Sequence, residues 1–251
     1  MRARVPAVVN LFCALALAAG AAHAQDSSAA AAPADTAKKP AATKAAAKPA
    51  AKPNSAATDP AIKAIDAQIA KLAVDKKDPA WKTKLKMPTV PKFDPAKGYY
   101  ARMVTNKGTM LIKFKPDVAP MHVTNFIYLT RLGFYDGIKF HRVMKGFMAQ
   151  GGDPLGNGTG GPGYQFAGEI SPKANHDAPG VLSTANAGPG TDGSQFFIMF
   201  QAEPRLNGGY TVFGQVVEGL ETLKAIEAVA NPGDGPPIEP VLMTKVTIEV
   251  R

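Results

Sequence analysis

The C-terminal three-fifths of this 251-residue chain is predicted to be mainly β, with either a closed barrel or a sandwich architecture. From residue 99 onward, short runs rich in β-branched and aromatic residues are broken by Gly and Pro. Only two segments of that part carry a helical pattern, and it contains no internal repeat. Many short strands with two isolated helices are typical of barrels and sandwiches.

The first two strands are predicted to form a hairpin. Residues 99–105 and 109–115 flank Asn106-Lys107-Gly108, a sequence that favours a chain reversal. The further strand-like runs are residues 138–143, 147–150, 181–185, 195–200, 211–217 and 242–250.

Two helices are predicted within this domain. The first covers residues 120–132, begins at a proline and ends before Gly133. The second covers residues 221–230, with Leu223, Ile226 and Val229 on one face.

A short amphipathic helix is predicted ahead of the domain, in a segment spanning residues 59–96. Asp59-Pro60 supplies an N-cap and a first-turn proline. The apolar stripe consists of Ile62, Ile65, Ile69 and Leu72. This helix could pack on the C-terminal domain, dock a client protein or lie on a membrane. A further possibility is that residues 60–96, which contain Trp81, form a client-docking arm.

The first 24 residues are typical of a secretory signal peptide. Arg2 and Arg4 precede an apolar stretch over residues 8–22, and Ala22-His23-Ala24 offers a cleavage site. The only cysteine, Cys13, would leave with the signal, which suits an oxidising compartment. We therefore expect a periplasmic or otherwise extracytoplasmic protein.

Residues 25–58 are rich in Ala, Lys and Pro and are predicted to be a disordered linker. Residues 1–96 hold 15 Lys and Arg against 7 Asp and Glu, which leaves 14 against 13 for residues 97–251. The basic part could contact an anionic wall polymer or membrane, or serve as a solvated spacer. The nearly neutral domain gives no reason to expect nucleic-acid binding.

Several reaction classes lack support. His122, His141 and His176 have no metal-ligand spacing, and no G-x-S-x-G elbow is present. Residues 156–161 fit G-x-G-x-x-G, but Pro162-Gly163 follows where a nucleotide-binding helix would begin. We therefore expect neither a metal nor a cofactor.

Three blocks place polar residues inside strongly apolar runs. They are FHRVMKGFMAQGGD at residues 140–153, ANAGP with GSQFFI at residues 185–198, and LNG with VFGQV at residues 206–216. With these blocks the sequence resembles the cyclophilin family of peptidyl-prolyl isomerases from about residue 99 to the C-terminus. The resemblance implies an eight-stranded antiparallel β-barrel closed by two helices, forming a domain over residues 97–251.

The resemblance also implies a site. Arg142 would donate to the prolyl nitrogen as the peptide bond twists, and Phe147 and Gln150 would complete the catalytic group. The implied substrate-binding residues are His141, Met148, Ala185, Asn186, Gln195, Phe197, Leu206 and Tyr210. The implied partners are proline-containing polypeptides, in particular unfolded exported proteins, and we expect a monomer.

Two positions depart from the pattern of the best-known eukaryotic members. Arg205 stands where many have tryptophan, and Tyr210 where many have histidine. Members without that tryptophan tend to be less sensitive to cyclosporin, so we expect weakened inhibition. The alternative to an isomerase is a holdase that grips proline-bearing segments with little turnover and is tethered by its basic tail. A further alternative is that tethering, rather than catalysis, is the protein's main role.

Overall fold

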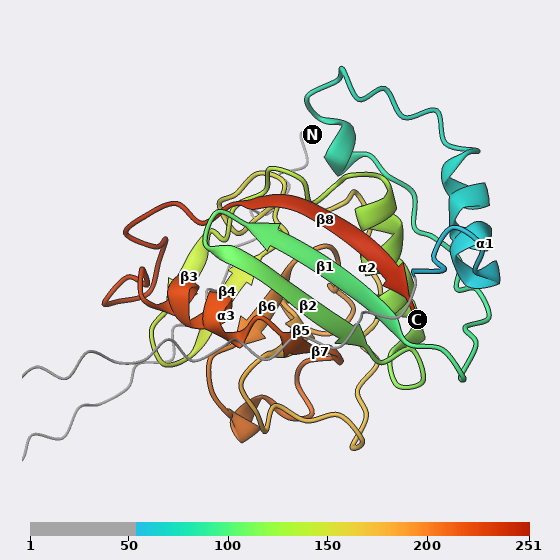
Figure 1. Cartoon of the computed structure of the whole chain (residues 1–251). Coiled ribbons are helices and arrows are strands. Elements are labelled where there is room, and N and C mark those ends of the chain that lie inside the picture. Colours follow the sequence, from blue (N-terminus) through green and yellow to red (C-terminus); the bar gives the residue numbers. More distant parts are fainter. Residues whose placement is uncertain (1–53) are drawn as a thin grey trace, which may run out of the picture. The chain divides into compact units, whose positions relative to one another are not determined.

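The structure, a computed structural model, describes residues 54–251 (Figure 1). The predicted signal peptide and residues 25–53 of the predicted linker lie outside the described residues. The helices are α1 (Pro60–Ile69), α2 (Pro120–Arg131) and α3 (Leu220–Glu227), with 3-10 turns at Trp81–Thr83 and Pro204–Leu206. The strands are β1 (Tyr99–Thr105), β2 (Gly108–Phe114), β3 (Arg142–Met144), β4 (Met148–Gly151), β5 (Val181–Thr184), β6 (Phe196–Met199), β7 (Val212–Glu218) and β8 (Met243–Val250).

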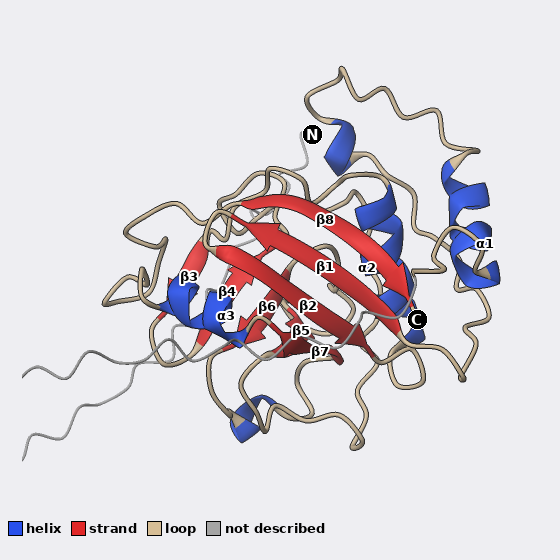
Figure 2. Cartoon of the chain, viewed as in Figure 1, coloured by secondary structure: helices blue, strands red, loops and turns tan. Residues whose placement is uncertain are grey.

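The eight strands form one antiparallel sheet in the order β3-β4-β6-β5-β7-β2-β1-β8, rolled into a half-barrel (Figure 2). Strands β3 and β8 are the two ends of this order. The segment before β3 is linked by main-chain hydrogen bonds to the start of β8 and to the residues before it, from Gly137 N to Met243 O at 2.8 Å and from Phe140 N to Val241 O at 2.9 Å. The mainly β prediction is confirmed.

Predicted and observed element boundaries agree to within a few residues at every strand except one. The run at residues 138–143 is a strand only from Arg142, because its earlier part is limited to an isolated bridge between Lys139 and Leu242. The helix predicted at residues 221–230 begins at Leu220 and ends at Glu227. It starts directly after Gly219, whose left-handed φ of 88° ends β7.

The core lies between the curved sheet and helix α2. Phe126 of α2 is 1% exposed, and its ring centroid lies 4.6 Å from that of Tyr135, 5.4 Å from Phe196 and 5.9 Å from Phe213. Aromatic pairs at these separations stabilise a core beyond their buried area. This cluster fixes α2 on the sheet, and α2 in turn carries side chains toward the candidate site.

Residues 54–96 pack on the same domain, which answers the question left open for helix α1. Ile62 and Ile65 are fully buried and belong to the main core, and α1 lies alongside α2 (Figure 1). Arg131 of α2 binds Asp66 of α1 through two hydrogen bonds of 2.8 and 2.7 Å. Of the three roles considered for this helix, the structure shows packing on its own domain.

The prediction that the linker is disordered up to residue 58 is wrong for its last residues. The Ser55 N–H donates to Val250 O at 2.9 Å, and the Val250 N–H donates to Asn54 Oδ1 at 3.0 Å. The end of β8 therefore gains hydrogen-bond partners from residues 54 and 55. Composition predicted disorder because Ala, Lys and Pro bury little apolar surface, but main-chain pairing does not need apolar side chains.

The extended part of the segment also contacts the domain. The Leu85 N–H donates to Pro162 O at 2.9 Å, and the Tyr128 hydroxyl donates to Lys86 O at 2.9 Å. Trp81 packs edge-on against Phe134, with ring centroids 6.3 Å apart. Among the described residues, no helix is both long enough and apolar enough to span a bilayer.

Asp59→Ala is expected to lower the free energy of unfolding by about 1–2 kcal/mol, measured by chemical denaturation. Asp59 Oδ1 accepts the N–H groups of Ala61 and Ile62 at the start of α1, and its Oδ2 pairs with Lys97 Nζ at 2.8 Å. Asp59→Asn keeps the capping oxygen and is the matched control, for which we expect a smaller loss. Equal stability of Asp59→Ala and the unmodified protein would show that this cap contributes nothing.

Candidate active site

The sheet has two faces at β3, β4 and β6, and the outer one carries the candidate site. Arg142 is the register partner of Gln150, which is in turn the partner of Phe197. Partners directly opposite one another in adjacent strands share a face, and alternate residues of a strand point to opposite faces. The intervening residues Val143, Ala149 and Ile198 are fully buried in the main core. Period-two alternation therefore places Arg142, Gln150 and Phe197 together on the other face.

A chain of side-chain hydrogen bonds runs across this face. Arg142 Nη1 donates to Gln150 Oε1 at 3.3 Å, and Gln150 Nε2 donates to Gln195 Oε1 at 3.0 Å. Gln195 Nε2 then donates to the carbonyl oxygens of Gly158 and Gly160 at 3.0 and 2.9 Å. Three predicted site residues thus form one polar network that ends on the 153–160 loop.

The 153–160 loop is organised by a buried carboxylate. Asp153 is 1% exposed, and its two oxygens accept the N–H groups of Leu155, Asn157 and Gly158 at 2.6–2.9 Å. Burial alone would raise the pKa of Asp153, but these main-chain donors outweigh it and hold the pKa below its usual value. The sequence only excluded a nucleotide-binding motif at residues 156–161, whereas the structure uses this loop to hold the carbonyl oxygens that orient Gln195.

A small apolar cluster lies beside the polar network and is separate from the main core. Its buried members are Met148, Val181, Phe197, Met199 and Val212. The partly buried residues packed against it include Phe147, Ala185, Leu206 and Tyr210. The Tyr210 ring meets the Phe197 ring edge-on, with centroids 5.7 Å apart. All six predicted apolar or aromatic contact residues therefore meet in one cluster.

Arg142 has a partner that sequence reasoning missed. Asp234, in the loop between α3 and β8, binds Arg142 Nε through Oδ1 and Arg142 Nη2 through Oδ2, the latter at 2.7 Å. The Arg142 guanidinium lowers the pKa of Asp234. A guanidinium has five N–H donors, of which the bonds to Asp234 and Gln150 use three. Two donors are therefore left for another acceptor.

The resemblance implied that His141 binds substrate, but the structure buries most of its ring. Its side chain is 8% exposed, and neither ring nitrogen has a hydrogen-bond partner among the described residues. Burial lowers the pKa of His141, so the neutral ring is favoured near neutral pH. A hydrogen bond between His141 and Arg142 is not formed.

Asn186 and Arg205 lie at the edges of the cluster. Asn186 follows Ala185, whose N–H donates to Gln195 O at 3.0 Å, so the loop that carries Asn186 is joined to the polar network. Arg205 is exposed and forms an ion pair with Glu203 through two hydrogen bonds of 2.7 and 2.8 Å. An arginine held by its own neighbour presents charge where a tryptophan would present an apolar ring.

Comparisons with known proteins give the same result for sequence and for structure. Residues 100–248 match the family model "Cyclophilin type peptidyl-prolyl cis-trans isomerase/CLD". Peptidyl-prolyl cis-trans isomerase B of Streptomyces anulatus is 44% identical over 177 residues, which cover 62% of this chain and 99% of that protein. Peptidyl-prolyl cis-trans isomerase A of Mycobacterium tuberculosis is 44% identical over 165 residues, covering 59% of this chain and 91% of that protein.

A solved structure of a relative extends the match to the fold. The crystal structure of a Cryptosporidium parvum cyclophilin-type isomerase, in the presence of the dipeptide Ala-Pro, aligns with a TM-score of 0.58 and 37% identity. The alignment covers 60% of this chain and 98% of that one. Because the profile, the relatives and the fold agree over one stretch of more than half its length, the chain belongs to the cyclophilin-type peptidyl-prolyl cis-trans isomerases.

Proposed function

We propose that the protein catalyses the cis–trans isomerisation of X-Pro peptide bonds in polypeptides. The observation that carries the proposal is a guanidinium with unused donors, Arg142, beside a separate apolar cluster on a rigid sheet. Resonance gives the peptide C–N bond a rotational barrier of about 18–20 kcal/mol. Uncatalysed X-Pro bonds therefore exchange in tens to hundreds of seconds. A catalyst needs only to bind the twisted bond better than the planar one.

Arg142 is suited to that task. When the bond twists, the prolyl nitrogen loses resonance and regains a lone pair that accepts a hydrogen bond. The planar nitrogen offers no such acceptor, so an N–H donor of Arg142 favours the twisted state selectively. Asp234 and Gln150 hold the guanidinium in place before the substrate binds, which avoids reorganisation during the reaction.

The remaining site residues bind the substrate on both sides of that bond. The proline ring would enter the apolar cluster at Phe147, Met148, Phe197 and Leu206. Gln150 and Asn186 would hydrogen-bond the substrate main chain and fix one side while the other rotates. Ala185, Gln195 and Tyr210 would line the groove, and His141 would contribute by packing beneath the 153–160 loop.

The natural substrates proposed here are unfolded proteins outside the cytoplasm. The proposal rests on the signal-like first 24 residues and on a mature chain without cysteine. Its basic tail would contact anionic wall polymer or membrane, and the enzyme would act as a monomer. Mass spectrometry of the protein from its native host should give an N-terminus at Gln25, and an intact Met1 in a cytoplasmic fraction would contradict export.

The refolding of a protein limited by X-Pro isomerisation tests the function and separates it from the holdase alternative. We expect residues 54–251 to accelerate the slow phase at a molar ratio well below one, because an enzyme turns over. A holdase would act only near equimolar ratios and would slow refolding. Retardation without substoichiometric acceleration would contradict the proposed function.

A further inference from the structure

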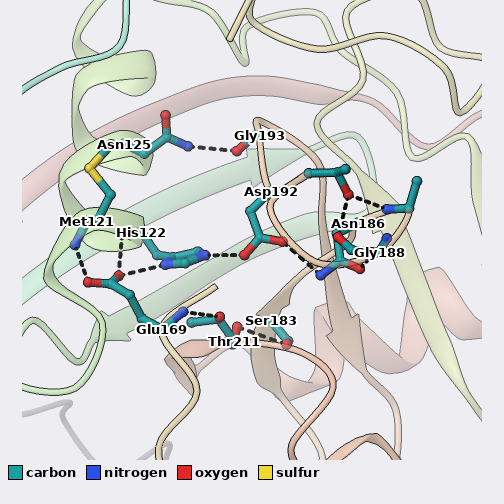
Figure 3. A network of polar contacts seen from close by, with 12 residues as sticks. Met121, His122, Asn125, Glu169, Ser183, Asn186, Gly188, Asp192, Gly193 and Thr211 are labelled. Atoms are coloured by element: carbon teal, nitrogen blue, oxygen red, sulfur yellow. Dashed lines mark hydrogen bonds and ion pairs between the residues drawn. The ribbon is translucent and has the colours of Figure 1, made fainter. Parts of the chain in front are cut away.

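The imidazole of His122, on α2, lies between two carboxylates (Figure 3). Its Nδ1 is 2.7 Å from Glu169 Oε2, and its Nε2 is 2.8 Å from Asp192 Oδ2. A neutral imidazole has a single N–H, so it could donate to only one of these oxygens and would turn a lone pair toward the other. The geometry therefore fits the doubly protonated imidazolium, which donates to both.

Asp192 also binds Asn186, a residue of the loop that is predicted to contact substrate. Its second oxygen, Oδ1, accepts from Asn186 Nδ2 at 2.8 Å, while Asn186 Oδ1 accepts the Gly188 N–H at 3.2 Å (Figure 3). The Asn186 side chain is thus held at both ends. Asp192 itself is 1% exposed, so its contacts with His122 and Asn186 are shielded from water.

Helix α2 holds the same loop at a second point. Asn125, three residues after His122 and so on the same side of the helix, donates from Nδ2 to the carbonyl oxygen of Gly193 at 2.8 Å. Glu169 in turn accepts the N–H groups of Met121 and His122 at 3.0 Å each, at the first turn of α2. The helix start and the loop therefore form one connected polar unit.

We propose that Asp192, held by the His122 imidazolium, is a positioning residue that sets the conformation of Asn186 for substrate binding. The inference rests on the proposed function, because it assumes that Asn186 contacts an X-Pro peptide. The His122–Asp192 pair adds no catalytic group. It fixes a loop whose displacement would remove one main-chain contact with the peptide and weaken its affinity.

The pair also makes peptide binding depend on pH. Only two charged groups contact the His122 ring among the described residues, Glu169 and Asp192, and the Phe166 and Phe213 rings pack beside it. Burial by itself lowers the pKa of His122, but the hydrogen bonds to Asp192 and Glu169 outweigh it, so the pKa lies above 6.5.

Because the pKa of His122 is raised, its charge stabilises the folded conformation of this polar unit. That stabilisation is complete below pH 6.5 and is lost as the pH rises through the folded-state pKa. Above that pKa, the neutral ring has a single N–H, so it can donate to only one of Asp192 and Glu169 and the unit loses one of its two hydrogen bonds from His122. We therefore expect peptide affinity to fall as the pH rises above the folded-state pKa of His122.

The test measures the affinity of an X-Pro peptide by NMR titration for residues 54–251 and two variants, across a pH series. Asp192→Ala removes the acceptor of Asn186 Nδ2 and should weaken binding about tenfold, equivalent to about 1.4 kcal/mol. Asp192→Asn keeps that acceptor, and its amide N–H can donate to a neutral His122. It should therefore restore most of the affinity and remove the pH dependence.

The matched control is Asp136→Ala. The Asp136 carboxylate likewise accepts an amide N–H, that of the Val246 main chain at 3.0 Å, but it lies outside the 185–195 loop, so its loss should leave the affinity unchanged. The His122 ring should titrate above pH 6.5 in the unmodified protein and at a lower pH in Asp192→Asn.

Affinity of Asp192→Ala equal to that of the unmodified protein would overturn the inference, as would an Asp192→Asn variant that binds no better than Asp192→Ala. If Asp192→Ala does not fold, the pH profile of Asp192→Asn decides. A profile with the alkaline loss unchanged would contradict the inference. An unmodified protein that binds peptide without turnover would remove the proposed function and leave this inference standing.

Discussion

Arg142→Ala is expected to lower kcat/KM for a short Ala-Pro peptide by about 10²–10³, the usual cost of losing one preorganised transition-state donor. Arg142 is the charged side chain beside the apolar cluster, and its bonds to Asp234 and Gln150 leave two N–H donors unused. Because the interaction arises only in the twisted state, kcat should fall far more than peptide affinity. A protease-coupled isomerisation assay measures the rate.

Two further variants make this result specific. Arg142→Lys keeps a positive charge but loses the planar fork that binds Asp234 and Gln150 together, so we expect an intermediate rate. Arg131→Ala removes an arginine that also forms a two-bond ion pair, with Asp66 on α1, and it should keep the full rate. An unchanged rate in Arg142→Ala would show that the chemistry lies elsewhere.

Ile65→Ala is expected to lower the free energy of unfolding by about 2–5 kcal/mol. Ile65 lies on α1, outside the 97–251 domain defined by resemblance, yet it is fully buried in the main core. Truncating it would leave a cavity between the N-terminal segment and the domain. Chemical denaturation followed by fluorescence measures the loss.

Lys63→Ala is the matched control, because Lys63 is an exposed residue of the same helix. Its effect should stay within about 0.5 kcal/mol. A loss of that small size in Ile65→Ala would instead mean that residues 54–96 dock weakly and that the domain is stable without them. On the present structure, experiments should use residues 54–251 rather than 97–251.

The strand-rich fold could be predicted because each strand leaves a local pattern. At β4 and β6, alternation puts Ala149 and Ile198 in the core and Gln150 and Phe197 on the site face. The docking of α1 could not be predicted in the same way. Its stripe at Ile62 and Ile65 shows that one face is buried, but an apolar stripe carries no information about the surface that covers it.

In the candidate site, too, the residues within one local motif could be predicted, and the contacts between distant segments could not. Arg142 and Gln150 lie eight positions apart in one hairpin, so a continuous motif contains both. Asp234 is 92 positions from Arg142, and His122 is 70 positions from Asp192. Such pairs are formed by the tertiary fold between segments that carry no shared local signal. The sequence therefore identified the residues expected to contact substrate and missed the acidic groups that position them.

The most direct test is an NMR exchange spectrum of an Ala-Pro peptide, recorded with a catalytic amount of residues 54–251 and then with Arg142→Ala. The structure predicts cis–trans exchange cross-peaks at mixing times of tenths of a second for the unmodified protein. The variant should still bind the peptide but show no such peaks. Equal exchange in both samples would contradict the role of Arg142, and exchange in neither would contradict the assignment of isomerase activity.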